Sequence, residues 1–187
     1  MREFLFICFV LLGSLSLQAM ELSVDQFKAE APKMKMLIVD LEGVLASDQR
    51  IVSAKEPQAI ILSARDQAAI VEARDHGIYI VIVAKCRMPE AVVKWAREAG
   101  VSYLFDERTT KNGLLLDLHF KTFISEKNMA YIAGNSADLE TMKACGLIIA
   151  PQDADAELKA KANFITGRKS GEGVLDEVIH FVISKSS

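Results

Sequence analysis

Two carboxyl groups and a glycine stand at the end of one short apolar run, where they could carry out chemistry. The run occupies residues 36–39 and leads into Asp40, and Glu42 and Gly43 follow within three residues. Carboxyl groups serve as nucleophiles, as general acids or bases, and as ligands of magnesium. The run is short, apolar and rich in β-branched residues, which predicts a buried parallel strand ending at Asp40. Gly43 allows the tight turn that brings the backbone close to whatever Asp40 contacts.

Alternating strands and helices are predicted to position these groups. The predicted strands occupy residues 35–40, 78–83, 101–105, 129–133, 147–149 and 163–165, and the predicted helices occupy residues 66–76, 89–99, 111–123, 138–144, 154–162 and 173–184. This alternation indicates right-handed βαβ units. The predicted fold class is therefore α/β, a doubly wound parallel sheet, which binds ligands along the edge where Asp40 would lie.

One segment and the overall length complete the predicted architecture. Residues 50–62 are predicted to form a β-hairpin flap, because two apolar stretches bracket Pro57. The 187 residues, the 51% hydrophobic content and the net charge of −3 describe one globular domain without a large cap. We assign residues 20–34 to a linker and residues 35–187 to the domain. The chain has no basic excess, which argues against nucleic acid as a partner.

The N-terminus predicts export. Residues 4–17 form an almost unbroken apolar run behind Arg2. The run is short for a membrane span and typical of a signal peptide. We expect a signal peptide at residues 1–19 and a periplasmic or secreted mature chain with no membrane span, and an uncleaved membrane anchor is the alternative. An oxidising compartment would permit a disulfide between Cys86 and Cys145, but two unpaired thiols are the favoured interpretation.

Several motifs together resemble one branch of the haloacid dehalogenase (HAD) superfamily, the 3-deoxy-D-manno-octulosonate 8-phosphate phosphatases. The resemblance extends from residue 35 to about residue 183. The motifs are Asp40-x-Glu42-Gly43-Val44-Leu45, Ala64-Arg65-Asp66, Lys111, Tyr131-Ile132-Ala133-Gly134-Asn135-x-x-Asp138, and the tail Gly171-Glu172-Gly173. The resemblance implies a HAD-like, Rossmannoid fold and a magnesium-dependent phosphatase that forms an aspartyl-phosphate. It also implies a homo-oligomer, a tetramer in that branch, and a phosphorylated small molecule as ligand.

The resemblance also assigns roles to the first motif residues. Asp40 matches the nucleophile, Glu42 stands where the acid/base aspartate is expected, and Lys111 matches the lysine of the branch. A lysine and a magnesium ion are needed because an anionic carboxylate must approach an anionic phosphoryl group, and like charges repel. The extra methylene of Glu42 moves its carboxyl group by about 1.5 Å, and misplacement on that scale can cost about 100-fold in rate.

Other positions depart from the pattern of the branch. Ala84 ends the second strand where the branch has Thr or Ser, so that only backbone amides near Ala84 and Lys85 could hold phosphate. The acidic pair after the fourth strand is replaced by Gly134 and Asn135. The expected magnesium ligands are therefore the Asp40 carboxylate and, as weak partners, the backbone carbonyl of Glu42 and the side chain of Asn135, and we expect weak binding. Arg65 and Asp66 match the Arg-Asp pair of the branch, which resembles a substrate-side element, and a charge pair at a helix N-terminus is the alternative.

Three functional hypotheses follow. The first is an exported phosphatase-like protein whose catalysis is impaired or lost. The second is an active magnesium-dependent phosphatase of sugar phosphates or other phosphomonoesters. The third is a receiver-like phospho-acceptor domain, which also has an Asp at a strand end and a later Lys. The third hypothesis is the weakest, because the acidic pair expected beside a phospho-accepting Asp is absent from the sequence.

Overall fold

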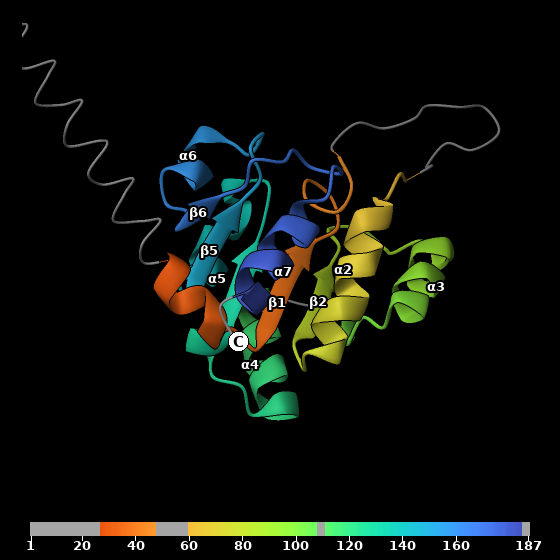
Figure 1. The fold of residues 1–187 in the computed structure, drawn as a ribbon, viewed down its shortest axis with the longest axis horizontal. Coiled ribbons are helices and arrows are strands. Elements are labelled where there is room, and N and C mark those ends of the chain that lie inside the picture. The colour runs from red at the N-terminus through yellow and green to blue at the C-terminus, as the bar shows by residue number, and fades with distance from the viewer. Residues whose placement is uncertain (1–26, 48–59, 108–110, 185–187) are drawn as a thin grey trace, which may run out of the picture.

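The structure of the chain is a computed structural model, and it describes residues 27–47, 60–107 and 111–184. These residues form a six-stranded parallel sheet with helices on both faces, in the strand order β3-β2-β1-β4-β5-β6 (Figure 1). The elements are η1 (Ala31–Lys33), β1 (Met36–Asp40), α2 (Ala64–Asp75), β2 (Tyr79–Val83), α3 (Glu90–Ala99), β3 (Tyr103–Phe105), α4 (Lys111–Thr122), η2 (Glu126–Asn128), β4 (Met129–Ile132), η3 (Ser136–Asp138), α5 (Leu139–Met142), β5 (Leu147–Ala150), α6 (Ala156–Lys159), β6 (Phe164–Ile165) and α7 (Val174–Ser184). The predicted α/β class and doubly wound parallel sheet are confirmed.

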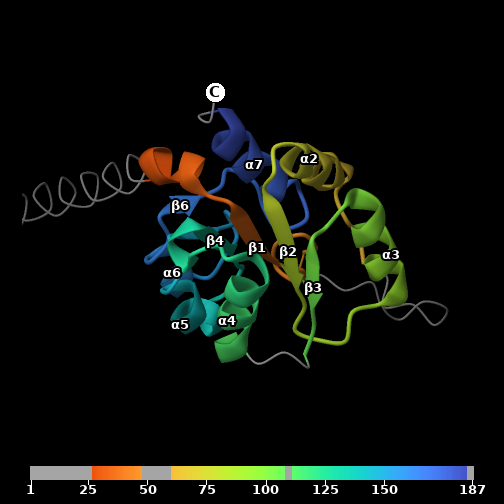
Figure 2. The same ribbon diagram turned by 90° about the horizontal axis from the view of Figure 1, so that it is seen from below.

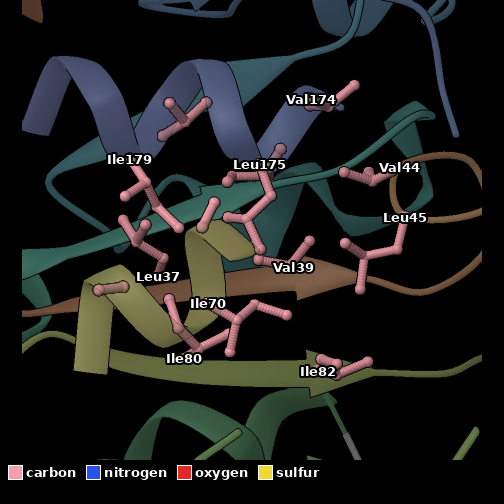
Figure 3. Close-up of a cluster of buried hydrophobic side chains, with 14 of the residues drawn as sticks. Leu37, Val39, Val44, Leu45, Ile70, Ile80, Ile82, Val174, Leu175 and Ile179 are labelled. Carbon is pink, nitrogen blue, oxygen red and sulfur yellow. The ribbon is translucent and has the colours of Figure 1, made fainter. Parts of the chain in front are cut away.

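Strand β1 lies at the centre of the sheet and is buried along its whole length. Side chains alternate between the two faces of a strand. Leu37 and Val39 pack with α2 and α7 on one face, as Figure 3 shows, whereas Met36 and Ile38 pack on the other face with residues of α4, α5 and α6. Helix α3 joins α2 and α7 on the first face (Figure 2). The apolar run seen in the sequence is therefore hydrophobic because both faces of β1 are covered.

The domain extends further toward the N-terminus than the predicted boundary at residue 35. Phe27, inside the expected linker, is fully buried and stacks on Phe164 with 4.2 Å between the ring centroids. Its ring also makes an edge contact with Phe181 of α7. The sequence pattern of this segment is too weak to predict such packing, because its few apolar residues have no clear period. The described part of the expected linker thus packs on the core through Phe27, Ala31 and Met34.

Two other predictions concern segments that lie wholly or mostly outside the described residues. The predicted flap at residues 50–62 lies almost entirely outside them, and residues 60–62 have no regular secondary structure. The predicted signal peptide at residues 1–19 lies wholly outside them.

Cys86 and Cys145 are free thiols, and burial raises the pKa of Cys145 to about 12.

Candidate active site

Three loops meet at the carboxyl edge of the sheet and gather the predicted site positions. Asp40 ends β1, Ala84 directly follows β2, and Gly134 and Asn135 come just after β4. Strands β2, β1 and β4 are neighbours in the sheet, so their carboxyl ends lie side by side. Lys111 begins α4, but the placement of its side chain is not described.

Asp40 is almost completely buried, with 2% of its surface exposed. The Tyr131 hydroxyl donates a hydrogen bond of 3.2 Å to Asp40 Oδ1. Burial raises the pKa of the Tyr131 phenol, and the nearby charge of Asp40 raises it further, so that the phenol stays protonated and acts as a donor. On the other carboxylate oxygen, Lys85 Nζ lies 3.9 Å from Asp40 Oδ2. The carboxylate is thus held between a neutral donor and a positive charge.

Glu42 is turned toward the backbone of the next loop. Its Oε2 accepts a hydrogen bond of 3.1 Å from the backbone N–H of Lys85. The loop that carries Glu42 is closed by hydrogen bonds from the Gly43 N–H to the Ala46 carbonyl and from the Ala46 N–H to the Leu41 carbonyl, and Gly43 has a left-handed φ of 82°. The Lys85 N–H, one of the backbone amides predicted from the sequence to bind phosphate, is therefore already hydrogen-bonded to Glu42.

Ala84 is buried and brings no polar side-chain atom to this edge. Its backbone N–H donates a 2.9 Å hydrogen bond to the Phe105 carbonyl, which extends the pairing of β2 with β3. This amide also does not point to an incoming anion. The two backbone amides that the sequence suggested in place of the missing hydroxyl, those of Ala84 and Lys85, are both engaged within the chain.

Gly134 lies directly against the loop that follows β1. A Cβ atom at this position would come within 2.4 Å of the Gly43 carbonyl oxygen, a distance that real Cβ atoms do not reach. The same Gly43 carbonyl accepts a 2.8 Å hydrogen bond from the Ser170 hydroxyl, and the Gly171 N–H donates to the Val44 carbonyl. Gly171 of the tail thus lies against the loop that follows β1, and the lack of a side chain at residue 134 permits Gly134 to approach the same loop.

Asn135 caps a short helix, and Asp138 is buried three residues later. Asn135 Oδ1 accepts a 3.1 Å hydrogen bond from the Ala137 N–H and so caps η3. Asp138 is buried, with 1% of its surface exposed, at the start of α5. Among the described residues there is no group of three or more His, Cys, Asp or Glu side chains that could hold a metal ion.

The Arg65-Asp66 pair divides into an exposed and a buried member. Arg65 is exposed in the first turn of α2. Asp66 is fully buried, and its Oδ1 accepts a 3.0 Å hydrogen bond from the Asp176 N–H at the start of α7. A carboxylate at a helix N-terminus satisfies a backbone donor that the helix itself leaves unpaired. Asp66 therefore joins α2 to α7, and of this pair only Arg65 is open to a ligand.

Asp66 should make the stability of the protein depend on pH. Burial raises the pKa of its carboxyl group to about 6 from 3.8, although the N–H groups of Asp176 and Leu175 lower it. The folded state then binds the proton more tightly than the unfolded state, so this stability is present below pH 3.8 and is lost as the pH rises through 6. Between pH 4 and 7, we expect the free energy of unfolding of Asp66→Asn to rise relative to the unmodified chain by up to about 3 kcal/mol.

Urea denaturation at several pH values measures this difference. Asp75→Asn is the matched control, because Asp75 is an exposed aspartate at the end of the same helix. Its free energy of unfolding should run parallel to that of the unmodified chain. If the free energy of unfolding of Asp66→Asn also runs parallel to that of the unmodified chain, the raised pKa assigned to Asp66 is wrong.

Two residues of the site were not singled out from the sequence. Tyr131 was noted only as part of a strand motif, and Ser170 was not noted. The available signal for Tyr131 was a hydroxyl-bearing residue on the strand beside the one that ends in Asp40. Ser170 gave no signal, because its contact with Gly43 joins segments 127 residues apart.

The sequence is similar to curated phosphatases along most of its length. It is 26% identical over 155 residues to the 3-deoxy-D-manno-octulosonate 8-phosphate phosphatase KdsC of Escherichia coli, which covers 83% of this chain and 82% of that protein. It is 23% identical over 150 residues to KdsC of Haemophilus influenzae, covering 80% and 83%. No family model matches the chain.

Solved structures of the same enzymes share the fold. A phosphatase of this name from Yersinia pestis has a TM-score of 0.81 and 23% identity, covering 87% of each chain. Another, from Moraxella catarrhalis in complex with a magnesium ion, a phosphate ion and a KDO molecule, has a TM-score of 0.80 and 22% identity, covering 86% of this chain and 92% of that one. The chain therefore has a HAD-like fold, and the resemblance to the octulosonate phosphatase branch is confirmed.

The prediction of export is wrong. The KdsC proteins that the chain matches are cytoplasmic enzymes. The apolar run at residues 4–17 suggested a signal peptide, but the positive charge that should precede it is weak, because Glu3 offsets Arg2. Within the described part of the chain, every helix is too short or too polar to cross a membrane.

Proposed function

We propose that this HAD-like chain, which resembles the octulosonate 8-phosphate phosphatases, is a phosphatase-like protein whose catalysis is impaired or lost. One observation carries the proposal. The ammonium of Lys85 lies beside the Asp40 carboxylate, with 3.9 Å between Nζ and Oδ2. The neighbouring strand ends carry Ala84 and Gly134 in place of a phosphate-binding hydroxyl and a metal carboxylate.

The chemistry of phosphoryl transfer explains why these replacements matter. In the proposed ancestral reaction, Asp40 attacks phosphorus, Glu42 transfers the proton and Lys111 offsets the negative charge. Catalysis of this kind depends on donors and cations that are already aimed at the charge developing in the transition state. Here, the Lys85 N–H is engaged by Glu42, and Asn135 Oδ1 accepts from the Ala137 N–H. These contacts support the loss of phosphate and metal positions together.

The proposed ligand is a phosphorylated small molecule at the carboxyl edge of the sheet. Lys85 and Arg65 are exposed basic residues that could contact its phosphate. The Moraxella catarrhalis phosphatase, in complex with phosphate and KDO, supports this class of ligand. We also propose that the chain forms a homo-oligomer, a tetramer as in the branch. Its interface would bury the exposed apolar side chains of Leu116, Phe120 and Phe123, on and just after α4.

A second candidate function is an active, magnesium-dependent phosphomonoester phosphatase that forms an aspartyl-phosphate. It is favoured by the position of Asp40 at the end of the central strand, where a nucleophile would meet its substrate, and by the names of the relatives. It would use magnesium held by Asp40, Glu42 and Asn135. The two candidates differ in whether turnover depends on Asp40.

Exchange of the proposed nucleophile separates them. Phosphate release from 3-deoxy-D-manno-octulosonate 8-phosphate and from a panel of small phosphomonoesters should be measured with magnesium for the unmodified chain and for Asp40→Asn. We expect equal rates, because residual hydrolysis should not pass through Asp40. Asp75→Asn, an exposed exchange of the same kind, is the control. Magnesium-dependent turnover that disappears in Asp40→Asn would establish the active phosphatase instead.

A further inference from the structure

Lys85 contacts both carboxylates of the motif that follows β1. Its side-chain Nζ lies 3.9 Å from Asp40 Oδ2, and its backbone N–H donates a 3.1 Å hydrogen bond to Glu42 Oε2. In this ion pair the Asp40 side chain is 3% exposed and the Lys85 side chain 34%, whereas in the pairs Lys33–Glu30, Lys94–Glu98 and Lys121–Asp117 both side chains are at least 35% exposed. The contact is thus of a different kind from the surface pairs of the molecule.

A buried carboxylate needs compensation for the water that it has lost. The Tyr131 hydroxyl donates a hydrogen bond to Asp40 Oδ1, and the positively charged Lys85 ammonium lies near Oδ2. In a magnesium-dependent phosphatase, the metal supplies the positive charge at this carboxylate. In this chain, a side chain supplies it, and the contact with Glu42 holds the backbone of Lys85 in place.

The other positions expected to hold magnesium do not fit the ion. Magnesium demands a nearly regular octahedron of oxygen ligands at short range. Gly134 has no side chain, and the Gly43 carbonyl occupies the space where its Cβ would lie. Asn135 Oδ1, the expected amide ligand, accepts from the Ala137 N–H. A divalent cation at Asp40 would also be repelled by the ammonium already beside that carboxylate.

We propose that Lys85 is an internal counter-ion that takes the place of the divalent cation at Asp40 and makes this site independent of magnesium. The inference rests on the proposed function, because it gives the physical reason for the loss of metal-dependent catalysis. It makes a prediction that the proposed function alone does not make. Removal of the ammonium should open Asp40 to a divalent cation again.

The test compares magnesium binding by the full chain and by Lys85→Met, which keeps the length of the side chain and removes the charge. Calorimetric titration with magnesium chloride should show at least about tenfold tighter binding by Lys85→Met. At 10 mM magnesium, its melting temperature should rise by about 3 °C, whereas that of the unmodified chain should not change. The double variant Lys85→Met/Asp40→Asn should lose both responses, because the gained ion would bind at Asp40.

Two further variants act as controls. Lys94→Met removes a lysine whose Nζ also lies 3.9 Å from a carboxylate oxygen, that of Glu98, in an exposed pair on α3. It should not respond to magnesium. Lys85→Arg keeps the positive charge and should also stay indifferent. If Lys85→Met folds only when magnesium is present, that result supports the proposal as well.

Two results would overturn the inference. One is magnesium binding by the unmodified chain with a dissociation constant below about 1 mM. This measurement needs no variant, so it tests the inference even if Lys85→Met does not fold. The other is a folded Lys85→Met that binds magnesium no better than Lys94→Met. Turnover through Asp40 without magnesium would refute the proposed function but leave this inference standing, so that the two failures are distinguishable.

Discussion

Hydrolysis of 3-deoxy-D-manno-octulosonate 8-phosphate by the purified chain is expected to be at least about 10⁴-fold slower than hydrolysis by Escherichia coli KdsC assayed in parallel. Removal of one preorganised donor from an oxyanion site costs about 10²–10³ in rate. Ala84 removes such a donor, and the amides nearby are already engaged. Loss of the metal charge at Asp40 should cost at least as much, because an anionic nucleophile then meets an anionic substrate with less compensation.

The assay is phosphate release over time at saturating substrate, with and without magnesium. A range of smaller phosphomonoesters serves as the control for substrate choice, because a general loss of chemistry should slow them all. A rate within about tenfold of KdsC on any of them would contradict the proposed loss, since a single missing donor already exceeds that factor.

Gly134→Asp is expected to lower the free energy of unfolding by about 4 kcal/mol rather than to restore a metal ligand. A Cβ at residue 134 would meet the Gly43 carbonyl oxygen at 2.4 Å, so one of the two loops must move. Movement is opposed by the hydrogen bond from the Ser170 hydroxyl to that carbonyl and by the left-handed φ of Gly43. The new carboxylate would in addition lie beside a carbonyl oxygen, which cannot donate a hydrogen bond to it.

Denaturant unfolding of three glycine variants tests this account. Gly134→Ala adds only the Cβ and should lose about 2 kcal/mol, the usual scale for overpacking. Gly167→Ala is the matched control, because its Cβ would make only ordinary contacts at 3.8 Å with the Glu177 carboxylate and its φ is not positive. If Gly134→Asp is as stable as Gly167→Ala, the β1 loop yields freely and the steric account of residue 134 is wrong.

Periodicity predicted the fold well because its elements are long or strongly apolar. The run that ends in Asp40 became β1 at the centre of the sheet, and the helix predicted at residues 173–184 became α7. The spacing of apolar residues shows whether an element is buried on one face or on both, and this spacing is visible within a short stretch of sequence. Phe27 was missed because its burial depends on Phe164, and no local pattern connects residues so far apart.

The candidate site was predictable in its positions but not in its contacts. The sequence placed Asp40, Ala84 and Gly134 at one edge, because parallel neighbouring strands bring their carboxyl ends together. It could not show that Lys85, taken as a loop residue near phosphate, lies beside Asp40 and binds Glu42 through its backbone. Such contacts depend on rotamers and loop closure, which residue types and spacing do not determine.

A single-turnover experiment tests the central claim most directly. The unmodified chain, in large excess over a phosphomonoester and in the presence of magnesium, is mixed with substrate, and phosphate release is followed alongside Asp40→Asn. This design detects one round of chemistry even when product release is slow. The account predicts that both proteins release phosphate at the same background rate. A magnesium-dependent burst in the unmodified chain that is absent from Asp40→Asn would contradict it.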